Sequence, residues 1–424
     1  MQTTLAPKIR QSRHAEAIES ILRKCVHCGF CNATCPTYQL GGDELDGPRG
    51  RIYQMKQYFE GEEANAEMLK HLDRCLTCRS CETTCPSGVH YSHLLEIGKE
   101  MIEVDLPRSR FDRLRRGAIV RFINSGWVFA STIRIGQALA GMMPAGIRRS
   151  IPQRQVAVPR SQAQHSRKVL MLAGCVQPSM MPNVNTATAR VLDAVGVQTV
   201  VAPSAGCCGA VKFHLNDHDG GQAHMRANID AWWPFIAPTN GDTPVESIVM
   251  NASGCGVMVK DYGYVLRNEP AYADKAARVS ALTKDLSELL PDWVAALRPK
   301  LVGDGAASAE KPVLAYHPPC TLQHGQQLRG GVEQHLSQLG FTVAVAQNES
   351  HLCCGSAGTY SVLNPDLSKQ LRDRKLGNLK QVGASSIISA NVGCISHLQS
   401  GTDVPVRHWV EVLDAALTKA SVAG

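Results

Sequence analysis

Residues 25–36 of the chain read CVHCGFCNATCP, and residues 75–86 read CLTCRSCETTCP. Both stretches follow the pattern C-x2-C-x2-C-x3-C-P, in which three cysteines are separated by two residues each and a fourth precedes proline. Three thiolates at this spacing wrap one loop around a metal centre, while the fourth lies on the segment that leaves the loop. The occurrence of this pattern twice decides how the N-terminal third of the chain folds.

The spacing is that of bacterial ferredoxins, which hold two [4Fe–4S] clusters. In such proteins the fourth cysteine of each run binds the other cluster, so we predict crossed ligand sets. Cluster 1 takes Cys25, Cys28, Cys31 and Cys85, and cluster 2 takes Cys75, Cys78, Cys81 and Cys35. Zinc sites instead use two C-x2-C pairs separated by a longer loop, which makes zinc the weaker interpretation. Four basic residues beside the ligands either offset thiolate charge or form a solvated face: Arg23, Lys24, Arg74 and Arg79.

The composition excludes several classes of protein. With 424 residues, 44% of them apolar, the chain has room for two or three domains with hydrophobic cores. A net charge of +7 over this length does not indicate a nucleic-acid partner. The first residues, MQTTLAPKIRQSRH, lack the apolar segment of a secretory signal. We therefore expect a cytoplasmic protein whose cysteines stay reduced or bind metal.

One apolar stretch, Phe122–Ile147, has the length to cross a bilayer. It is interrupted by Arg134 and Pro144, however, and an arginine at the centre of a membrane helix costs about 2.5–3.5 kcal/mol. We interpret the stretch as a buried or partner-facing helical hairpin. The alternatives are a helix lying on the membrane surface, which would place the protein peripherally on the cytoplasmic face of the inner membrane, and a true span.

After a linker over residues 151–168, the sequence repeats itself. The first copy contains VLMLAGC (169–175), GCCGA (206–210) and IVMNASGC (248–255). The second contains VLAYHPPC (313–320), LCCGSAG (352–358) and IISANVGC (387–394). Short apolar runs that alternate with helical stretches predict a parallel α/β layer in each copy. Ligands of such sheets gather at the carboxyl ends of the strands, where these cysteines fall.

Eight further cysteines divide evenly between the copies. In each copy an adjacent pair precedes a glycine, which permits a tight backbone that lets neighbouring thiols face one metal. We predict metal or cluster ligation, with a redox-active thiol pair and simple packing as the alternatives. The sets are Cys175, Cys207, Cys208 and Cys255, and Cys320, Cys353, Cys354 and Cys394. Each nearby histidine is either a hydrogen-bonded structural residue or a ligand or proton donor: His214, His218, His317, His351 and His397.

Several familiar sequence motifs are absent. The chain has no G-x-G-x-x-G after a strand and no G-x4-G-K-[ST], so nothing indicates a nucleotide, FAD or NAD site. It also has no H-E-x-x-H and no G-x-S-x-G. A chain that holds only one-electron carriers needs a partner with a two-electron cofactor, most simply a flavoprotein. We expect no catalytic residue on this chain.

The amino-acid sequence around the cysteines resembles that of the iron–sulfur subunits of bacterial glycolate oxidase (glycolate dehydrogenase). The resemblance is carried by residues 25–56 and 71–91, by both CCG segments, and by NIDAWWP (228–234), ASGCG (252–256) and VRHWVEVL (406–413). It implies a complex in which partner FAD subunits oxidise glycolate to glyoxylate, while this subunit passes electrons towards a quinone or respiratory acceptor. The alternatives are a subunit of a lactate or glycerol-3-phosphate dehydrogenase complex, and a heterodisulfide reductase-type catalytic subunit that uses the CCG cysteines.

The same resemblance implies a mainly helical, two-cluster ferredoxin-like domain followed by two repeated α/β CCG domains. The expected segments are residues 1–21, the ferredoxin-type domain 22–100, a helical connector and linker 101–166, a first CCG domain 167–298, a linker 299–311 and a second CCG domain 312–424. The fullest CCG motif ends in C-x2-C, but here Met258 and His397 take the last position. Four thiolates could still hold a [4Fe–4S] centre or another metal, or His397 could complete the second set.

Overall fold

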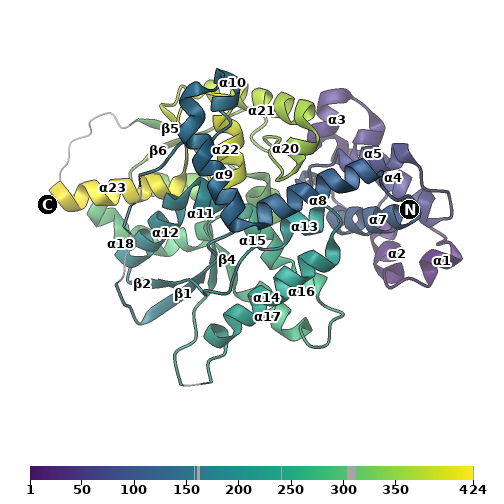
Figure 1. Ribbon diagram of the computed structural model, residues 1–424, viewed down its shortest axis with the longest axis horizontal. Coiled ribbons are helices and arrows are strands. Elements are labelled where there is room, and N and C mark those ends of the chain that lie inside the picture. The colour runs from purple at the N-terminus through teal and green to yellow at the C-terminus, as the bar shows by residue number, and fades with distance from the viewer. Residues whose placement is uncertain (157, 160–162, 240, 303–311, 424) are drawn as a thin grey trace.

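The computed structural model describes residues 1–156, 158–159, 163–239, 241–302 and 312–423 (Figure 1). Parts of both expected linkers, residues 157, 160–162 and 303–311, therefore lie outside the described residues. The described chain has a helical N-terminal third, a connector of two longer helices and two small parallel sheets. This order agrees with the predicted fold class.

The N-terminal third is built from short helices that pack around an apolar core. Ile18 and Leu22 from α2, Met55 and Phe59 from α4, and Leu94 from α7 are all fully buried in it. The cysteine loops lie between the helices. The elements are α1 (Pro7–Arg10), α2 (Ala15–Lys24), η1 (Phe30–Thr34), α3 (Pro36–Gly41), η2 (Glu44–Asp46), α4 (Pro48–Phe59), α5 (Ala66–Asp73), α6 (Ser80–Thr84) and α7 (Tyr91–Asp105).

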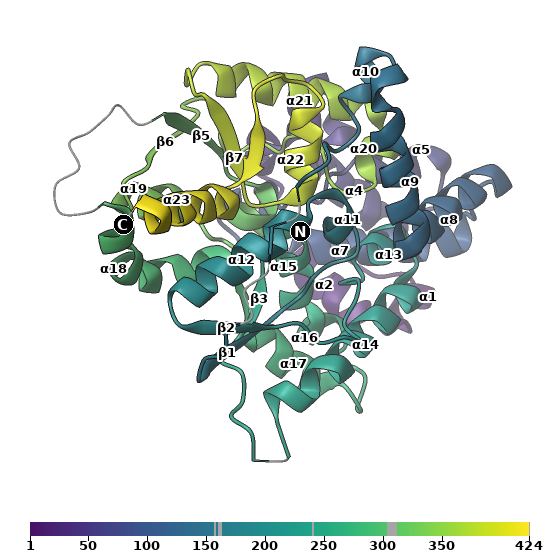
Figure 2. The ribbon, with the colours of Figure 1, turned by 60° about the vertical axis from the view of Figure 1, so that its left-hand side comes forward.

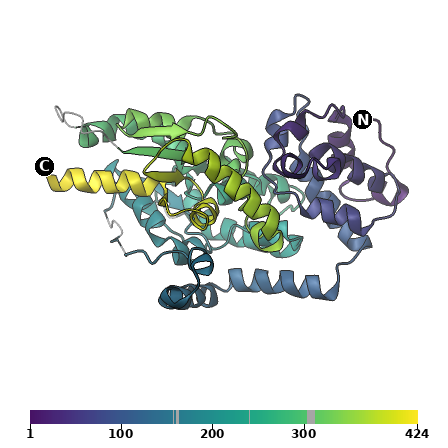
Figure 3. The ribbon, with the colours of Figure 1, turned by 90° about the horizontal axis from the view of Figure 1, so that it is seen from above.

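The connector lies on the outside of the molecule, where Figure 3 shows α8 running along its edge. It contains α8 (Arg110–Asn124), α9 (Gly126–Leu139), η3 (Ala140–Met142) and α10 (Ala145–Arg148). In α8 and α9 only Phe129 is buried, and Trp127 is 78% exposed. The predicted helices are confirmed. The expected hairpin was either buried or partner-facing, and within this chain α9 contacts α11 (Gln177–Met180) but leaves Trp127 and Ile135 exposed. None of the described helices is both long enough and apolar enough to cross a membrane.

The first repeat contains a parallel sheet with strand order β2-β1-β3-β4. Its central strand β1 leads directly to the loop that carries Cys175, and β3 leads to helix α15, whose first turn carries Cys255. The strands are β1 (Arg167–Met171), β2 (Val197–Val200), β3 (Ile248–Met250) and β4 (Thr283–Asp285). The helices are α11 (Gln177–Met180), α12 (Pro182–Ala194), α13 (Ala210–His214), α14 (His218–Ile236), α15 (Ser253–Lys260), α16 (Tyr262–Val265), α17 (Ala273–Leu282), η4 (Leu286–Leu289) and α18 (Leu290–Leu301).

The second repeat has the same topology, β6-β5-β7-β8, and its central strands lead to Cys320 and Cys394. The predicted parallel α/β repeat is therefore confirmed. The strands are β5 (Val313–His317), β6 (Thr342–Val345), β7 (Ser386–Ser389) and β8 (Val406–His408). The helices are the π-helical turn η6 (Thr321–Gly325), α19 (Gly331–Gln338), α20 (Tyr360–Leu363), α21 (Pro365–Lys380), α22 (Val392–Gln399) and α23 (Trp409–Ala423).

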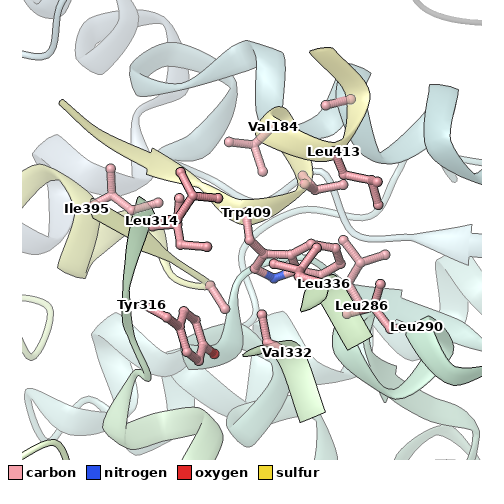
Figure 4. Close-up of a cluster of buried hydrophobic side chains, with 14 of the residues drawn as sticks. Val184, Leu286, Leu290, Leu314, Tyr316, Val332, Leu336, Ile395, Trp409 and Leu413 are labelled. Atoms are coloured by element: carbon pink, nitrogen blue, oxygen red, sulfur yellow. The ribbon is translucent and has the colours of Figure 1, made fainter. Parts of the chain in front are cut away.

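The two repeats share one hydrophobic core, in which α12 of the first packs against α23 of the second (Figure 2). Trp409 lies fully buried in this core beside Leu286 and Leu290 from the first repeat and Leu336 from the second (Figure 4). Helix α18 continues to Leu301, inside the segment expected to be a linker, because Leu290 and Leu297 bury their side chains in the same core. This packing holds the two cysteine-bearing sheet edges at fixed positions.

Candidate metal centres

The two cysteine loops of the N-terminal third share an unusual backbone. The φ angle is positive at His27 (59°) and Gly29 (88°), and also at the matching positions Thr77 (50°) and Arg79 (59°). Side chains other than glycine seldom adopt this conformation, which costs about 1–3 kcal/mol per residue and concentrates at functional sites. Both loops therefore have the same strained backbone conformation around their cysteines, as expected of loops that enclose a metal centre.

The first ligand set surrounds one small cavity. All four predicted cysteines of cluster 1 line it, together with Ile52, Pro86 and Tyr91. Burial and the neighbouring Cys25 thiol raise the pKa of Cys31 to about 12. Thiols in this position stay protonated unless a cation offsets their charge, and iron supplies that charge when it binds. Cys28 is the exposed member of the set, so this cavity lies next to the surface.

The second ligand set surrounds a neighbouring cavity, lined by all four predicted cysteines of cluster 2. Cys81 and Tyr91 line both cavities, which places the two sets side by side. The Cys75 sulfur accepts a contact of 3.5 Å from the Thr77 amide and one of 3.7 Å from the Tyr91 hydroxyl. Burial raises the pKa of Cys78 well above its usual value. The donor sets and the loop backbones therefore both fit a pair of [4Fe–4S] clusters.

Arg51 is a residue of this site that sequence reasoning missed. Its side chain lines the second cavity and is 1% exposed. The guanidinium donates to the His71 carbonyl (2.8 Å) and the Thr37 hydroxyl (3.2 Å), and lies 3.5 Å from Asp46. Burial acts to lower the pKa of Arg51, but the surrounding tyrosine, thiols and carboxylate raise it overall. A permanent positive charge therefore lies beside the second ligand set.

Three of the four basic residues that the sequence singled out pair with carboxylates. Arg23 pairs with Glu19 on the exposed face of α2, and Arg74 pairs with Asp46 at 2.8 Å. Arg79 forms an ion pair with Asp261, at the end of α15 in the first repeat. Of these, Arg79 therefore holds the N-terminal third against the first repeat.

The cysteine pairs of the two repeats have matching backbones. Gly209 (φ 91°) and Gly355 (φ 87°) follow the pairs, and each donates its amide to the sulfur two residues earlier at 3.4 Å. A Cβ atom at Gly209 would lie 2.7 Å from the Gly221 carbonyl oxygen, and one at Gly355 would lie 2.5 Å from that of Ser368. Only glycine fits these turns, as the sequence analysis expected.

The structure brings each set of four repeat cysteines together. In the first set Cys207 contacts Cys175 and Cys208, and Cys208 contacts Cys255. In the second set the sulfurs of Cys320 and Cys353 lie 3.6 Å apart, and Cys354 contacts Cys394. Four thiols that lie in contact with one another offer a complete donor set for one metal centre, which suits ligation better than packing.

The histidines near these sets differ in their contacts. His397 has its Nε2 atom 3.1 Å from the Ser368 hydroxyl and 3.2 Å from the Ser368 carbonyl, so this atom already has partners outside the second set. His214 lies 3.7 Å from Glu96, and His218 contacts Asn216 at 2.8 Å. His351 is half-buried, and its carbonyl accepts a hydrogen bond from His324. His317 alone among the five lies against the second cysteine set.

The second repeat set also adjoins the second ligand set of the N-terminal third. Cys78 shares a buried apolar cluster with Cys320 and Cys353, together with Leu76, Tyr360 and Leu371. This contact was not predictable from the sequence, because Cys78 and Cys320 are far apart in the chain and such a contact leaves no local pattern. Two thiol-rich sites are thus packed against each other across the boundary between the N-terminal third and the second repeat.

Comparisons with known proteins agree with this architecture. Residues 21–89 match the family model of the 4Fe-4S dicluster domain, and residues 169–260 and 314–399 match that of the cysteine-rich domain. The chain is 50% identical to the glycolate oxidase iron-sulfur subunit of Escherichia coli K12, over 99% of this chain and all of that protein. It is 27% identical to the probable glycolate oxidase iron-sulfur subunit of Bacillus subtilis 168, over 91% of this chain and 90% of the relative.

A more distant relative is lactate utilization protein A of an Exiguobacterium species, which is 24% identical over 59% of this chain and 99% of its own length. Together, the dicluster match and the similarity over the whole chain show that the protein carries two [4Fe–4S] clusters, and the cysteine-rich repeats fit a further one. The chain belongs to the family of glycolate oxidase iron–sulfur subunits.

Proposed function

We propose that the chain is the electron-transfer subunit of a flavin-dependent glycolate dehydrogenase complex. Partner FAD subunits would oxidise glycolate to glyoxylate, and this chain would pass the electrons towards a quinone or another respiratory acceptor. The observation that carries the proposal is the pair of adjoining cavities, each lined by all four cysteines of one predicted ligand set. Full-length similarity to a glycolate oxidase subunit supports glycolate as the substrate of the partner.

We assign the cluster ligands as the spacing predicts. Cys25, Cys28, Cys31 and Cys85 hold cluster 1, and Cys75, Cys78, Cys81 and Cys35 hold cluster 2. When bound, the clusters accept and release single electrons without rearrangement of covalent bonds. The protein contributes the surroundings: Arg51 places a positive charge beside the second set, and Pro36 and Pro86 each line the cavity next to their own cysteine.

The surface beside Cys28 is the proposed contact with the flavin subunit. Val26 is 67% exposed and Phe30 is 62% exposed, and both line the first cavity. Exposed apolar side chains next to an exposed ligand suit a protein partner, because docking there buries them and excludes water from the ligand. The second ligand set faces the interior and the second repeat instead.

We further propose that α8 and α9 contact the surface of an anionic membrane. Both helices expose large apolar side chains, among them Phe111, Trp127 and Ile135, beside exposed Arg121 and Arg134. Apolar and basic side chains on one surface favour binding to anionic lipid headgroups. Replacing Trp127 and Ile135 with serine should reduce co-flotation with anionic vesicles, whereas Val302→Ser should not. Equal flotation of all three proteins would contradict this contact.

The function is tested in the assembled complex with glycolate and the natural acceptor. Cys78→Ser should abolish turnover with that acceptor while the partner flavin is still reduced by glycolate. Thr77→Ser, beside the ligand, should leave turnover intact. Full turnover in the Cys78→Ser complex would contradict the proposal. Lactate is the second candidate substrate, supported by the partial similarity to lactate utilization proteins, and faster flavin reduction by lactate than by glycolate would favour it.

A further inference from the structure

His317 is a buried imidazole without a hydrogen-bond partner. It is the last residue of β5 and is 1% exposed. Neither Nδ1 nor Nε2 has a partner among the residues that the structure describes. Leaving a buried polar group unsatisfied costs about 1–3 kcal/mol, and native proteins seldom do so without a reason.

A thiol-rich site lies within reach of this ring. One ring nitrogen of His317 and the sulfurs of Cys354 and Cys394 all lie within 4.8 Å of one another. Both cysteines are almost fully buried, and each belongs to the second repeat set. Lys375, which is 2% exposed, adds a positive charge near the site and donates to the Glu349 and Ser350 carbonyls.

Two other histidines near the second repeat set have hydrogen-bond partners on their rings. His397 is bound to Ser368. His324 donates from Nε2 to the His351 carbonyl at 2.8 Å, and its Nδ1 atom lies 2.8 Å from the Thr83 hydroxyl. The vacant hydrogen-bonding positions of His317 therefore distinguish it from these two neighbours.

The first repeat shows that the fold does not require this histidine. His317 precedes Cys320 by three residues, and Leu172 precedes Cys175 by the same interval. Leu172 is also buried, at 3% exposed, and packs in the apolar core of its repeat. An apolar residue therefore satisfies the packing of this strand end, and the histidine in the second repeat needs a chemical explanation.

We propose that His317 is a nitrogen ligand of an iron–sulfur centre held by Cys320, Cys353, Cys354 and Cys394. This inference rests on the proposed function only in taking the chain to be an iron–sulfur electron carrier. A neutral imidazole adds a donor without adding negative charge, so a centre with this ligand is easier to reduce than one with a fifth thiolate in its place. The first repeat, with Leu172, lacks the donor. The two repeats are thus chemically unequal, and the site packed against Cys78 has the extra ligand.

The test uses the full chain, purified anaerobically and examined by pulsed EPR with and without 15N-labelled histidine. We expect a nitrogen hyperfine coupling that changes with the isotope, disappears in His317→Leu and persists in His397→Leu. His317→Cys, which keeps a ligand, should retain the iron of this centre without the coupling. His317→Cys should also make the centre harder to reduce. A centre that is retained with a changed potential shows that the nitrogen coupling was not lost through misfolding.

Three outcomes would overturn the inference. The first is a third centre whose spectrum shows no histidine nitrogen, and the second is the same nitrogen coupling in His317→Leu. The third is about eight irons per chain, which corresponds to two clusters and leaves no centre in the second repeat. Each of these results would leave the proposed function standing if the two N-terminal clusters are reduced by the partner flavin. Loss of those two clusters would instead contradict the proposed function.

Discussion

Thr83 and His324 are in contact across the boundary between the N-terminal third and the second repeat, with the Thr83 hydroxyl 2.8 Å from Nδ1 of His324. Because Nε2 of His324 donates to the His351 carbonyl, Nδ1 is the acceptor in this contact. Thr83 follows Cys81 on α6, and His324 follows Cys320 on η6. One hydrogen bond therefore joins the loop of cluster 2 to the cysteine loop of the second repeat.

Removing that hydroxyl should loosen the second cysteine loop. Thr83→Val keeps the shape of the side chain but loses a hydrogen bond with a net value of about 1 kcal/mol. We expect faster amide hydrogen exchange in η6. Thr84→Val is the matched control, because the Thr84 hydroxyl bonds to Thr34 within the N-terminal third, at 3.1 Å. Equal exchange in η6 for both variants would mean that the Thr83 contact does not order this loop.

The crossed ligand assignment makes a prediction that uncrossed ligation does not. Cys85→Ala should damage the cluster bound by the loop of Cys25, and Cys35→Ala should damage the cluster bound by the loop of Cys75. Each variant should therefore lose the EPR signal of the cluster in the other run. If Cys85→Ala instead removes the signal that Cys75→Ala removes, each run binds its own cluster and the crossed assignment is wrong.

The buried charge of Arg51 should raise the reduction potential of cluster 2. Arg51→Met removes that charge, so we expect the potential to fall by about 50 mV, with cluster 1 nearly unchanged. Arg51→Lys should restore most of the value, whereas Arg23→Met should shift neither cluster, because Arg23 is exposed and paired with Glu19. Redox titration followed by EPR measures both potentials. A fall in Arg51→Lys as large as in Arg51→Met would show that hydrogen bonding, and not charge, sets the potential.

Gly355 should tolerate no side chain. Alanine there would adopt a positive φ and place its Cβ 2.5 Å from the Ser368 carbonyl oxygen, so we expect a loss of about 3 kcal/mol in the free energy of unfolding. Gly358→Ala is the matched control: its φ is 60°, nothing lies within 4 Å of the added Cβ, and about 1 kcal/mol should be lost. Urea unfolding followed by circular dichroism compares the two. Similar midpoints for both variants would refute the steric argument.

The sequence contained most of the information about the cysteine sites, because ligand spacing is a local property. The C-x2-C-x2-C-x3-C-P runs predicted which eight thiols line the two cavities, and the two CCG segments predicted the glycine turns at Gly209 and Gly355. The alternation of apolar runs and helical stretches predicted two parallel sheets. The strand order was not predictable, because it depends on which strand pairs with β1 across long intervening segments.

The features that the sequence did not reveal arise from packing between distant segments. In the sequence, Arg51 cannot be distinguished from an exposed helical arginine. Its side chain is buried because α4 places it against the second cavity. The sequence pattern favoured His397 as the histidine that could complete the second set, but the fold places His317 beside the thiols and Nε2 of His397 beside Ser368. The exposure of Trp127 was not predictable, because hydropathy does not tell whether a partner or this chain covers an apolar helix.

The central claim is that the eight N-terminal cysteines hold the clusters through which substrate electrons leave the partner flavin. The most direct measurement mixes the assembled complex with glycolate anaerobically and follows it by rapid freeze-quench EPR. The account predicts that both cluster signals appear after flavin reduction and within the time of one turnover. Full acceptor reduction while both clusters stay oxidised throughout would contradict it.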